Sequence, residues 1–379
     1  MISTMFLVAV LLAFGQISLA VDTEPSCPTN SPTIRSGKLP QFVVLTFDDA
    51  VNNELWEAIY TDIFDDLTDP FTRCDLKATF FISHNNTNYA KVNQLFHDGH
   101  EIALHSYSHG GDRQDSESLV RKFRMGRWAL EIQQNINALI EHALLPKETY
   151  FGWRSPFLFT TGDESFTALN ASNILYDSSL SFYEKSWPYP LINDKKSSSC
   201  LIKPCPSQDY LLMEAPLSVW TGIDNEVCAM MDACKYGSTR EEAYEVMMAN
   251  FRRFHEENVP MPISLHGGAL INGNNGHFRE AFIDFLRTLL GMRDVHFVTM
   301  RQLVEFSRNP KNTFQFMREA RRACVTFRPK ESCQPKRPAC EFKNTDGENS
   351  VYLHTCAKRC PSQRLEIAFD YFGKSCCEA

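Results

Sequence analysis

The chain has 379 residues, of which 43% are hydrophobic and 22% are charged, so it is long and apolar enough to bury at least one large core. This composition excludes an intrinsically disordered or collagen-like chain. The formal net charge of −8 leaves no surplus of basic residues, so neither a nucleic acid nor an anionic membrane surface is expected as a partner.

The first twenty residues have the pattern of an export signal. An apolar run from Met5 to Phe14 precedes Ser18-Leu19-Ala20, a small-x-small pattern typical of signal-peptidase cleavage. We therefore expect a signal peptide at residues 1–20, a leader segment at 21–40, and a secreted, extracellular protein. The alternative is a buried amino-terminal strand or anchor, although this run is too short to span a bilayer.

Cysteine usage and glycosylation triplets agree with export. The chain has 13 cysteines, which would be hard to keep reduced and favour disulfide bonds in an oxidising compartment. Asn85 and Asn170 each begin an Asn-x-Ser/Thr triplet, which is compatible with a glycoprotein.

From residue 41 onward, short apolar runs alternate with amphipathic segments, as in βα units around a parallel sheet. The expected strands are residues 42–47, 78–82, 101–104, 150–152, 174–176, 211–213, 262–265 and 295–298. Eight strands are close to the number in a barrel. The sequence therefore predicts an α/β fold, a distorted (β/α) barrel of about seven to eight strands.

Helices are expected where apolar residues recur at three- and four-residue spacing, at 117–143, 240–257 and 278–290. The second of these can begin with a capping box formed either by Ser238 with Glu241 or by Thr239 with Glu242.

Two segments depart from the alternating pattern. Residues 183–237 are rich in Pro and Ser and contain four cysteines, which predicts a disulfide-pinned insertion that shapes a binding surface. Residues 318–379 contain seven cysteines and few apolar residues, which predicts a Cys-rich C-terminal appendage held by disulfides. This appendage could dock on the barrel, bind matrix or act as a protective plug.

Residues able to carry chemistry follow four of the expected strands: Asp48 and Asp49, His105 and His109, Arg154, and His266. Each alone is explained by a turn, a structural histidine or a surface ion pair. Together they would meet at one rim of a barrel. One aspartate and two histidines can hold a hydrolytic divalent metal and leave coordination positions open. The second aspartate can then act as a base, with the arginine keeping it ionised and the last histidine serving as an acid.

These four segments, in this order and spacing, resemble the motifs of polysaccharide deacetylases, carbohydrate esterase family four, from about Phe42 to Ser307. Within that family the chain is most similar to the animal chitin deacetylases, on stretches that include Lys77-Ala78-Thr79-Phe80-Phe81 and Met231-Asp232-Ala233-Cys234. The resemblance implies a NodB-like catalytic barrel at residues 41–317. It also implies an enzyme that removes N-acetyl groups from chitin or chitin oligomers, giving acetate and glucosamine units.

The resemblance further implies a role for each motif residue. Asp48 would be the general base, oriented by Arg154, and His266 the general acid. The metal would be held by Asp49, His105 and His109, and it would be zinc or another divalent ion.

The remaining implied roles concern the surroundings of the reacting groups. Asp177, within Tyr176-Asp177-Ser178, is expected to tune His266. The backbone amide of Phe157 would stabilise the oxyanion, Leu265 would line the acetyl-methyl pocket, and Trp187 would form an aromatic wall of the substrate groove.

Two other functions remain open at this point. The first is a chitin-binding, matrix-organising protein whose inherited site has little catalytic activity. The second is a deacetylase of another acetylated polysaccharide, since the same motifs serve esters and amides. We expect a monomer whichever of these functions holds.

Overall fold

A computed structural model describes residues 36–110, 116–192, 199–272, 277–326, 339–343 and 350–361, together with residues 32, 34, 332 and 333. The expected signal peptide at 1–20 and most of the leader segment at 21–40 lie outside the described residues. Within the described part of the chain, no helix is long and apolar enough to cross a membrane.

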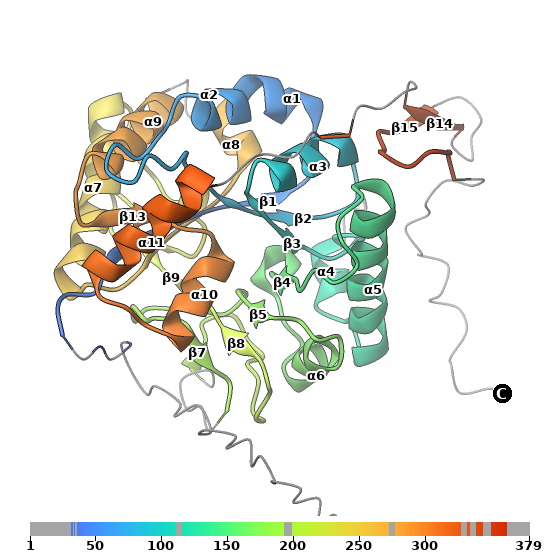
Figure 1. The fold of residues 1–379 in the computed structure, drawn as a ribbon. Coiled ribbons are helices and arrows are strands. Elements are labelled where there is room, and N and C mark those ends of the chain that lie inside the picture. Colours follow the sequence, from blue (N-terminus) through green and yellow to red (C-terminus); the bar gives the residue numbers. More distant parts are fainter. Residues whose placement is uncertain are drawn as a thin grey trace, which may run out of the picture.

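The core is a nine-stranded sheet with the strand order β12-β1-β2-β3-β4-β5-β8-β7, and β13 also pairs with β1. Its strands are β1 (Gln41–Asp49), β2 (Thr79–Ile82), β3 (Glu101–Leu104), β4 (Gly152–Trp153), β5 (Tyr176–Asp177), β7 (Tyr189–Pro190), β8 (Met213–Glu214), β12 (Met261–His266) and β13 (Val295–Phe297). Every pairing in this sheet is parallel except that of β7 with β8. Figure 1 shows that the sheet curls and that the helices surround it. The prediction of an α/β barrel-like fold is confirmed. A strand overlaps each expected range, although β4, β5 and β8 each share only one residue with theirs.

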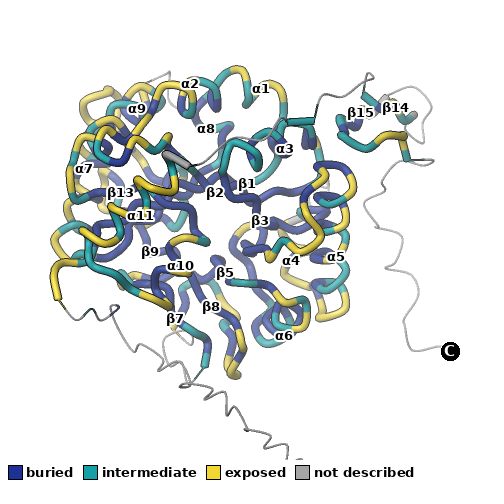
Figure 2. The backbone as a smooth tube through the Cα atoms, in the orientation of Figure 1, coloured by how far each residue is buried: buried dark blue, intermediate teal, exposed yellow. Residues whose placement is uncertain are grey.

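Central strand β1 is buried along eight of its nine residues, which is why its sequence is a continuous apolar run rather than an alternating one. The ring of Phe47 stacks on Phe80 of β2 with a centroid distance of 5.3 Å and packs edge-on against Tyr60 at 5.2 Å. Figure 2 shows the buried strands at the centre and exposed residues on the outer helices.

Smaller strand pairs flank the main sheet. The parallel pair β6 (Ser181–Phe182) and β9 (Leu217–Ser218) lies beside the open edge, because β9 contacts β12. Strands β10 (Trp220–Thr221) and β11 (Val227–Cys228) form an antiparallel hairpin, as do β14 (Cys340–Lys343) and β15 (Ser350–Leu353).

The longer helices are α3 (Tyr89–His97), α5 (Met125–His142), α6 (Asp163–Ala171), α7 (Arg240–Glu257), α9 (His277–Leu290), α10 (Met300–Arg308) and α11 (Thr313–Thr326). The shorter helical segments are α1 (Asn53–Leu55), η1 (Trp56–Tyr60), α2 (Thr61–Phe64), α4 (Ser116–Val120), η2 (Pro156–Leu158), η4 (Met231–Ala233) and α8 (Gly267–Asn272). Helix α7 has the predicted bounds, and Thr239 and Glu242 form its capping box. The single helix predicted at 117–143 is wrong: Arg124 has extended backbone angles and separates α4 from α5.

The expected insertion at 183–237 is pinned by the disulfides Cys200–Cys205 and Cys228–Cys234. It is not separate from the barrel, however, because it contributes β7 and β8 to the main sheet. The boundary expected between residues 317 and 318 is also wrong. Helix α11 continues across it to Thr326, and Cys324 within this helix is bonded to Cys74.

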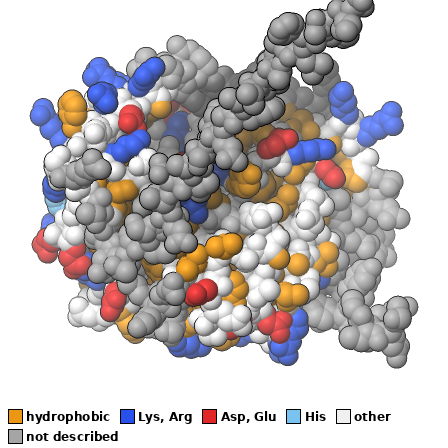
Figure 3. Space-filling view, turned by 60° about the horizontal axis from the view of Figure 1, so that its bottom comes forward, with side chains coloured by type: hydrophobic (Ala, Val, Ile, Leu, Met, Phe, Trp, Pro, Cys, Tyr) orange, Lys and Arg blue, Asp and Glu red, His pale blue; other side chains and the backbone are white. Residues whose placement is uncertain are grey.

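Charged side chains of both signs are interspersed over the part of the surface visible in Figure 3. Hydrophobic side chains lie between them in several small groups. This distribution agrees with the moderate acidic net charge of the sequence.

Candidate active site

Four strand ends bring the predicted residues to one edge of the sheet. Strand β1 ends in Asp48 and Asp49, and the neighbouring β12 ends in His266, which is in register with Asp48. Strands β3 and β4 lead directly into His105 and Arg154. Because these strands are parallel, their carboxyl ends share one edge, where α/β enzymes place their active sites.

The backbone turns sharply at the end of β1. Asp49 has a φ of +80°, in the left-handed region that residues other than glycine rarely adopt. This turn brings two consecutive carboxylates to one site, whereas neighbouring residues of a regular strand face opposite sides. Ser106, His109 and Phe157 also have positive φ values of 61°, 51° and 56°. Strained backbone is therefore concentrated here, as is common at functional sites.

A carboxylate and two imidazoles converge to form a metal-binding group. The ligand atoms of Asp49, His105 and His109 all lie within 4.8 Å of one another. Oδ1 of Asp49 is 3.1 Å from Nε2 of His109 and 3.5 Å from Nε2 of His105. Nδ1 of His105 lies 2.9 Å from the backbone carbonyl of Arg154, a partner that places the proton on Nδ1 and leaves Nε2 free to bind an ion. This donor set fits zinc or another divalent transition metal.

The two histidines keep Asp49 ionised. Burial by itself would raise the pKa of Asp49, but hydrogen bonds and charge interactions with His105 and His109 outweigh burial and lower the pKa well below its usual value. An ionised carboxylate is the form that binds a cation.

Asp48 forms a buried ion pair with Arg154. Nη1 of Arg154 lies 2.7 Å from Oδ1 of Asp48, and the arginine residue is fully buried. The guanidinium also donates to Oγ1 of Thr46 at 2.8 Å and to the backbone carbonyl of Ser178 at 3.0 Å, and it packs on the ring of Phe81. These contacts fix the arginine, so the position of the Asp48 carboxylate is fixed with it.

His266 is paired with Asp232, a residue of the short helix η4. Nδ1 of His266 is 2.7 Å from Oδ2 of Asp232, and Nε2 of His266 points toward Asp49, 3.9 Å from its Oδ2. Burial alone would lower the pKa of His266, but the hydrogen bond and charge of Asp232, helped by Asp48 and Asp49, raise it to about 9. The imidazole is therefore protonated at neutral pH.

The expectation that Asp177 tunes His266 is wrong. Asp177 is fully buried on β5, where its carboxylate accepts hydrogen bonds from the backbone N–H and the Oγ of Ser179 at 3.0 and 2.7 Å. Glu214 of the adjacent strand β8 is in register with it. Oγ of Ser179 in turn accepts from the backbone N–H of Ser155 at 2.8 Å. Asp177 therefore supports the segment that follows Arg154.

The expectation that Trp187 forms a wall of the groove is also wrong. Trp187 is 3% exposed and packs against the rings of Phe42 and Phe306 at 5.9 and 5.8 Å. Phe42 lies near the start of β1, at the opposite end from Asp48. Trp187 is therefore a core residue at the far end of the sheet.

The two other predicted residues lie at the site. Phe157 is 37% exposed and its ring contacts that of His109 at 4.8 Å. Leu265 is fully buried, immediately before His266 on β12.

Similarity to known proteins agrees with this geometry. Residues 36–163 match the family described as Polysaccharide deacetylase. The chain is 30% identical over 354 residues to chitin deacetylase 1 of Bombyx mori, covering 85% of this chain and 61% of that protein. It is 27% identical over 353 residues to chitin deacetylase 8 of Bombyx mori, covering 89% of this chain and 88% of that protein.

The chain is therefore similar to polysaccharide deacetylases, with the family match at residues 36–163. It spans less than two thirds of the length of the first Bombyx mori relative. Solved structures that resemble it include the Puue allantoinase, with 13% identity, a TM-score of 0.49 and coverage of 80% of this chain and 100% of that chain. They also include a family 4 acetyl xylan esterase from Clostridium thermocellum, with 18% identity, a TM-score of 0.39 and coverage of 70% and 91%.

A buried acid that the sequence analysis missed fixes the loop from His105 to His109, called the histidine loop below. Glu131 of α5 is fully buried. Its Oε2 accepts from Oγ of Ser106 at 2.7 Å and from the N–H of Ser108 at 2.8 Å, and its Oε1 accepts from Oγ of Ser108 at 2.7 Å. Nη2 of Arg127 lies 2.5 Å from Oε1 of Glu131 and balances the negative charge of this carboxylate. A signal was available, because Glu131 lies between Trp128 and Ile132 on the apolar face of an amphipathic helix.

Asp232 is the second functional residue missed. It lies between Cys228 and Cys234, within a stretch that carries the family resemblance. The feature that could have identified it as a site residue is a carboxylate between two closely spaced cysteines. It was not predicted to contact His266, because 34 residues separate the two in sequence.

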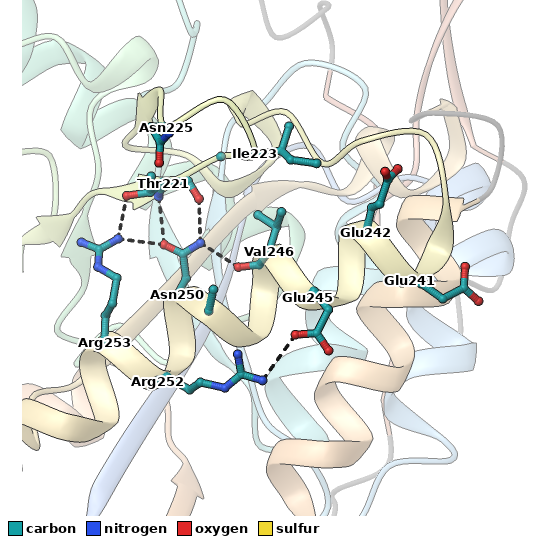
Figure 4. A pocket seen from close by; sticks show the side chains of 12 residues that line it. Thr221, Ile223, Asn225, Glu241, Glu242, Glu245, Val246, Asn250, Arg252 and Arg253 are labelled. Atoms are coloured by element: carbon teal, nitrogen blue, oxygen red, sulfur yellow. Dashed lines mark hydrogen bonds and ion pairs between the residues drawn. The ribbon is translucent and has the colours of Figure 1, made fainter.

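A separate hollow of about 690 Å³ lies between the β10–β11 hairpin and α7 (Figure 4). Its polar side chains are largely paired with one another: Arg252 contacts Glu245, and Arg253 contacts Thr221 and Asn250. None of the predicted site residues lines it, so it is distinct from the candidate active site.

Proposed function

We propose that the protein is a metal-dependent deacetylase that hydrolyses the N-acetyl groups of chitin or chitin oligomers, giving acetate and glucosamine units. The observation that carries this proposal is the placement of Asp48 and His266 on adjacent strands beside the ligand group Asp49, His105 and His109. The similarity to two chitin deacetylases supports the choice of substrate.

Asp49, His105 and His109 would hold the divalent cation, and zinc fits this set of one oxygen and two nitrogen donors. When bound, the ion would polarise the acetamide carbonyl and lower the pKa of the attacking water.

Asp48 is the proposed general base. Its carboxylate lies one residue from the ligand Asp49, and its ion pair with Arg154 holds it in place beside the ligand group. It takes a proton from the water as the water oxygen attacks the acetyl carbonyl carbon.

His266 is the proposed general acid. Its ring is protonated because of Asp232, and Nε2 faces Asp49. It gives a proton to the sugar nitrogen as the carbon–nitrogen bond breaks, so the amine leaves uncharged and acetate takes the water oxygen. An amide needs this step, since an unprotonated amine anion is a poor leaving group.

The remaining predicted roles stay part of the proposal. The N–H of Phe157 stabilises the oxyanion, and Leu265 lines the acetyl-methyl pocket. The left-handed backbone at Phe157 supports this role, because strained geometry at a site residue is kept where it serves function.

We also propose that the protein is extracellular. Five disulfides join ten of its cysteines among the described residues, and such bonds persist in oxidising compartments. We assign the catalytic barrel to residues 41–326, with the Cys-rich appendage after it, because α11 packs on the barrel through Phe316 and Phe42.

The test is acetate release from acetylated chitin oligomers by the zinc-loaded protein, compared with Asp48→Asn and with metal-stripped protein. Loss of the base is expected to lower the rate by about 10²- to 10⁴-fold, and removal of the metal to abolish it. Zinc binding by Asp48→Asn should remain, since Asp48 is not a ligand. A wild-type protein that binds zinc but releases no acetate would contradict the proposal, and faster release from acetyl xylan would overturn the choice of chitin.

A further inference from the structure

Residues 350–361, called the carboxyl-terminal segment below, are held by disulfides at Cys356 and Cys360 and dock on helices α3 and α5. The backbone carbonyl of His354 accepts a hydrogen bond from the N–H of Tyr89 at 3.0 Å, and the N–H of Cys356 donates to the carbonyl of His142 at 2.8 Å. Oγ1 of Thr355 lies 3.1 Å from Nδ1 of His142. Figure 1 shows β14 and β15 beside α3 at the periphery of the barrel. The segment thus holds the first residue of α3 and the last residue of α5.

Tyr89 extends from this contact toward the interior. Its side chain is 1% exposed, and its ring lies 5.5 Å from that of His142. Its hydroxyl is 2.7 Å from Nδ1 of His84. A buried phenol with one fixed hydrogen bond is a rigid spacer, because its ring has few alternative rotamers in a packed core.

His84 completes the path to the histidine loop. Its ring stacks on that of Tyr107 with a centroid distance of 4.4 Å and an interplanar angle of 11°. The backbone N–H of His84 donates to the backbone carbonyl of Tyr107 at 3.0 Å. Tyr107 is the central residue between His105 and His109. Contacts therefore run without interruption from the carboxyl-terminal segment to the loop that presents both imidazoles.

This loop needs external support. Ser106 and His109 both have left-handed backbone, a conformation that costs energy for residues with side chains and persists only when neighbours enforce it. Glu131 holds Ser106 and Ser108, while His84 holds Tyr107 between them. Glu131 and His84 thus hold three consecutive residues of the loop between them.

We propose that the carboxyl-terminal segment is a brace for the metal-binding loop, acting through Tyr89 and His84. The segment preorganises His105 and His109, so that less ordering is needed when the ion binds and metal affinity is higher. Tyr89 and His84 are positioning residues, since neither belongs to the ligand group. The inference rests on the proposed function, because it presumes that Asp49, His105 and His109 bind a metal.

The test is zinc affinity, measured by chelator competition on the full chain with Tyr89→Phe. This change removes only the hydroxyl that reaches His84. We expect the dissociation constant for zinc to rise about fivefold, as for the loss of one buried hydrogen bond that orders a ligand loop. Tyr176→Phe is the matched control. It removes an equally buried hydroxyl that donates to Glu101 at 2.8 Å, and it should leave the zinc affinity unchanged.

A second pair of variants tests the segment itself. Cys333→Ser with Cys356→Ser opens one of its disulfides, and Cys200→Ser with Cys205→Ser opens a disulfide elsewhere. Only the first pair should weaken zinc binding and change the visible absorption bands of the cobalt-loaded protein, which report ligand geometry.

Three outcomes separate the hypotheses. If wild type binds zinc and all variants match it, the brace is wrong while the proposed function stands. If Tyr89→Phe and Tyr176→Phe weaken zinc binding equally, the effect is general destabilisation and the brace is also wrong. If wild type binds neither zinc nor cobalt, the proposed function fails first.

Discussion

Oδ2 of Asp232 accepts two hydrogen bonds from His266, one from Nδ1 at 2.7 Å and one from the backbone N–H at 3.2 Å. One carboxylate oxygen therefore fixes both the ring and the strand end that carries it. Asp232 lies in a turn closed by the disulfide Cys228–Cys234 and held by the hydroxyl of Tyr236, which donates to the carbonyl of Met231 at 2.8 Å. The acid of the proposed reaction is thus set by a covalently closed loop.

Replacing Asp232 with Asn is expected to lower the pKa of His266 from about 9 toward or below its ordinary value of 6.5. The neutral amide no longer stabilises the imidazolium, while burial still opposes the charge. The measurement is an NMR titration of the metal-free protein, with His266→Gln identifying the resonance. An unchanged pKa would show that Asp232 does not control the ring.

The same shift links His266 to the stability of the fold. Its folded pKa is raised above the unfolded value, so its stabilising contribution is complete below pH 6.5 and is lost as the pH rises through about 9. Urea unfolding of wild type and Asp232→Asn at pH 6 and pH 10 checks this. The stability difference between the two proteins should be larger at pH 6.

Glu131→Gln is expected to weaken zinc binding about tenfold, because the amide cannot reproduce all three hydrogen bonds to Ser106 and Ser108. It should also lower the free energy of unfolding by about 3 kcal/mol, since the largely covered Arg127 side chain loses its counter-charge. Chelator competition and urea unfolding measure these effects. The control is Glu245→Gln, which breaks an exposed pair with Arg252 and should change neither. A loss of stability without a loss of zinc affinity would reduce Glu131 to a structural role.

Gly267→Ala is expected to destabilise the fold by about 1–3 kcal/mol. A Cβ at this position would lie 2.8 Å from the hydroxyl of Tyr60 and 3.1 Å from a methyl of Leu55. Tyr60 cannot move aside easily, because its ring packs edge-on against those of Phe47 and Phe80.

Tyr60→Phe should restore part of that stability, since it removes the atom that clashes. Alone it should be close to neutral, because the described residues offer the Tyr60 hydroxyl no hydrogen-bond partner. Urea unfolding of the two single variants and the double variant measures the coupling. Additive effects would show that the clash lies elsewhere.

The sequence allowed the strands and the positions of the reacting groups to be predicted, because both follow from local patterns. The runs at 101–104 and 240–257 were predicted with their bounds because the first is a short apolar strand between polar turns and the second has a capping box. Asp48, His105 and His266 could be expected together because parallel strands share one carboxyl edge.

Partners set by tertiary packing could not be predicted. Trp187 lies in a Pro-rich stretch without periodicity, and nothing local distinguishes a groove residue from one packed on Phe42. Asp177 is close to Arg154 in the order of strands, but its side chain pairs with Ser179 instead of reaching His266. Asp232 reaches the site through a loop whose path depends on a disulfide.

The disulfide between Cys74 and Cys324 joins residues 250 positions apart. Every residue of the proposed reaction except Asp48 and Asp49 lies between these two cysteines in the sequence. Those two are attached to Cys74 through the chain that contains α1, η1 and α2. A single peptide cleavage anywhere between the two cysteines would therefore leave both halves of the site covalently connected. If the protein is the extracellular enzyme proposed above, a protease that nicks one surface loop between these cysteines leaves its base, its acid and its metal ligands on one molecule.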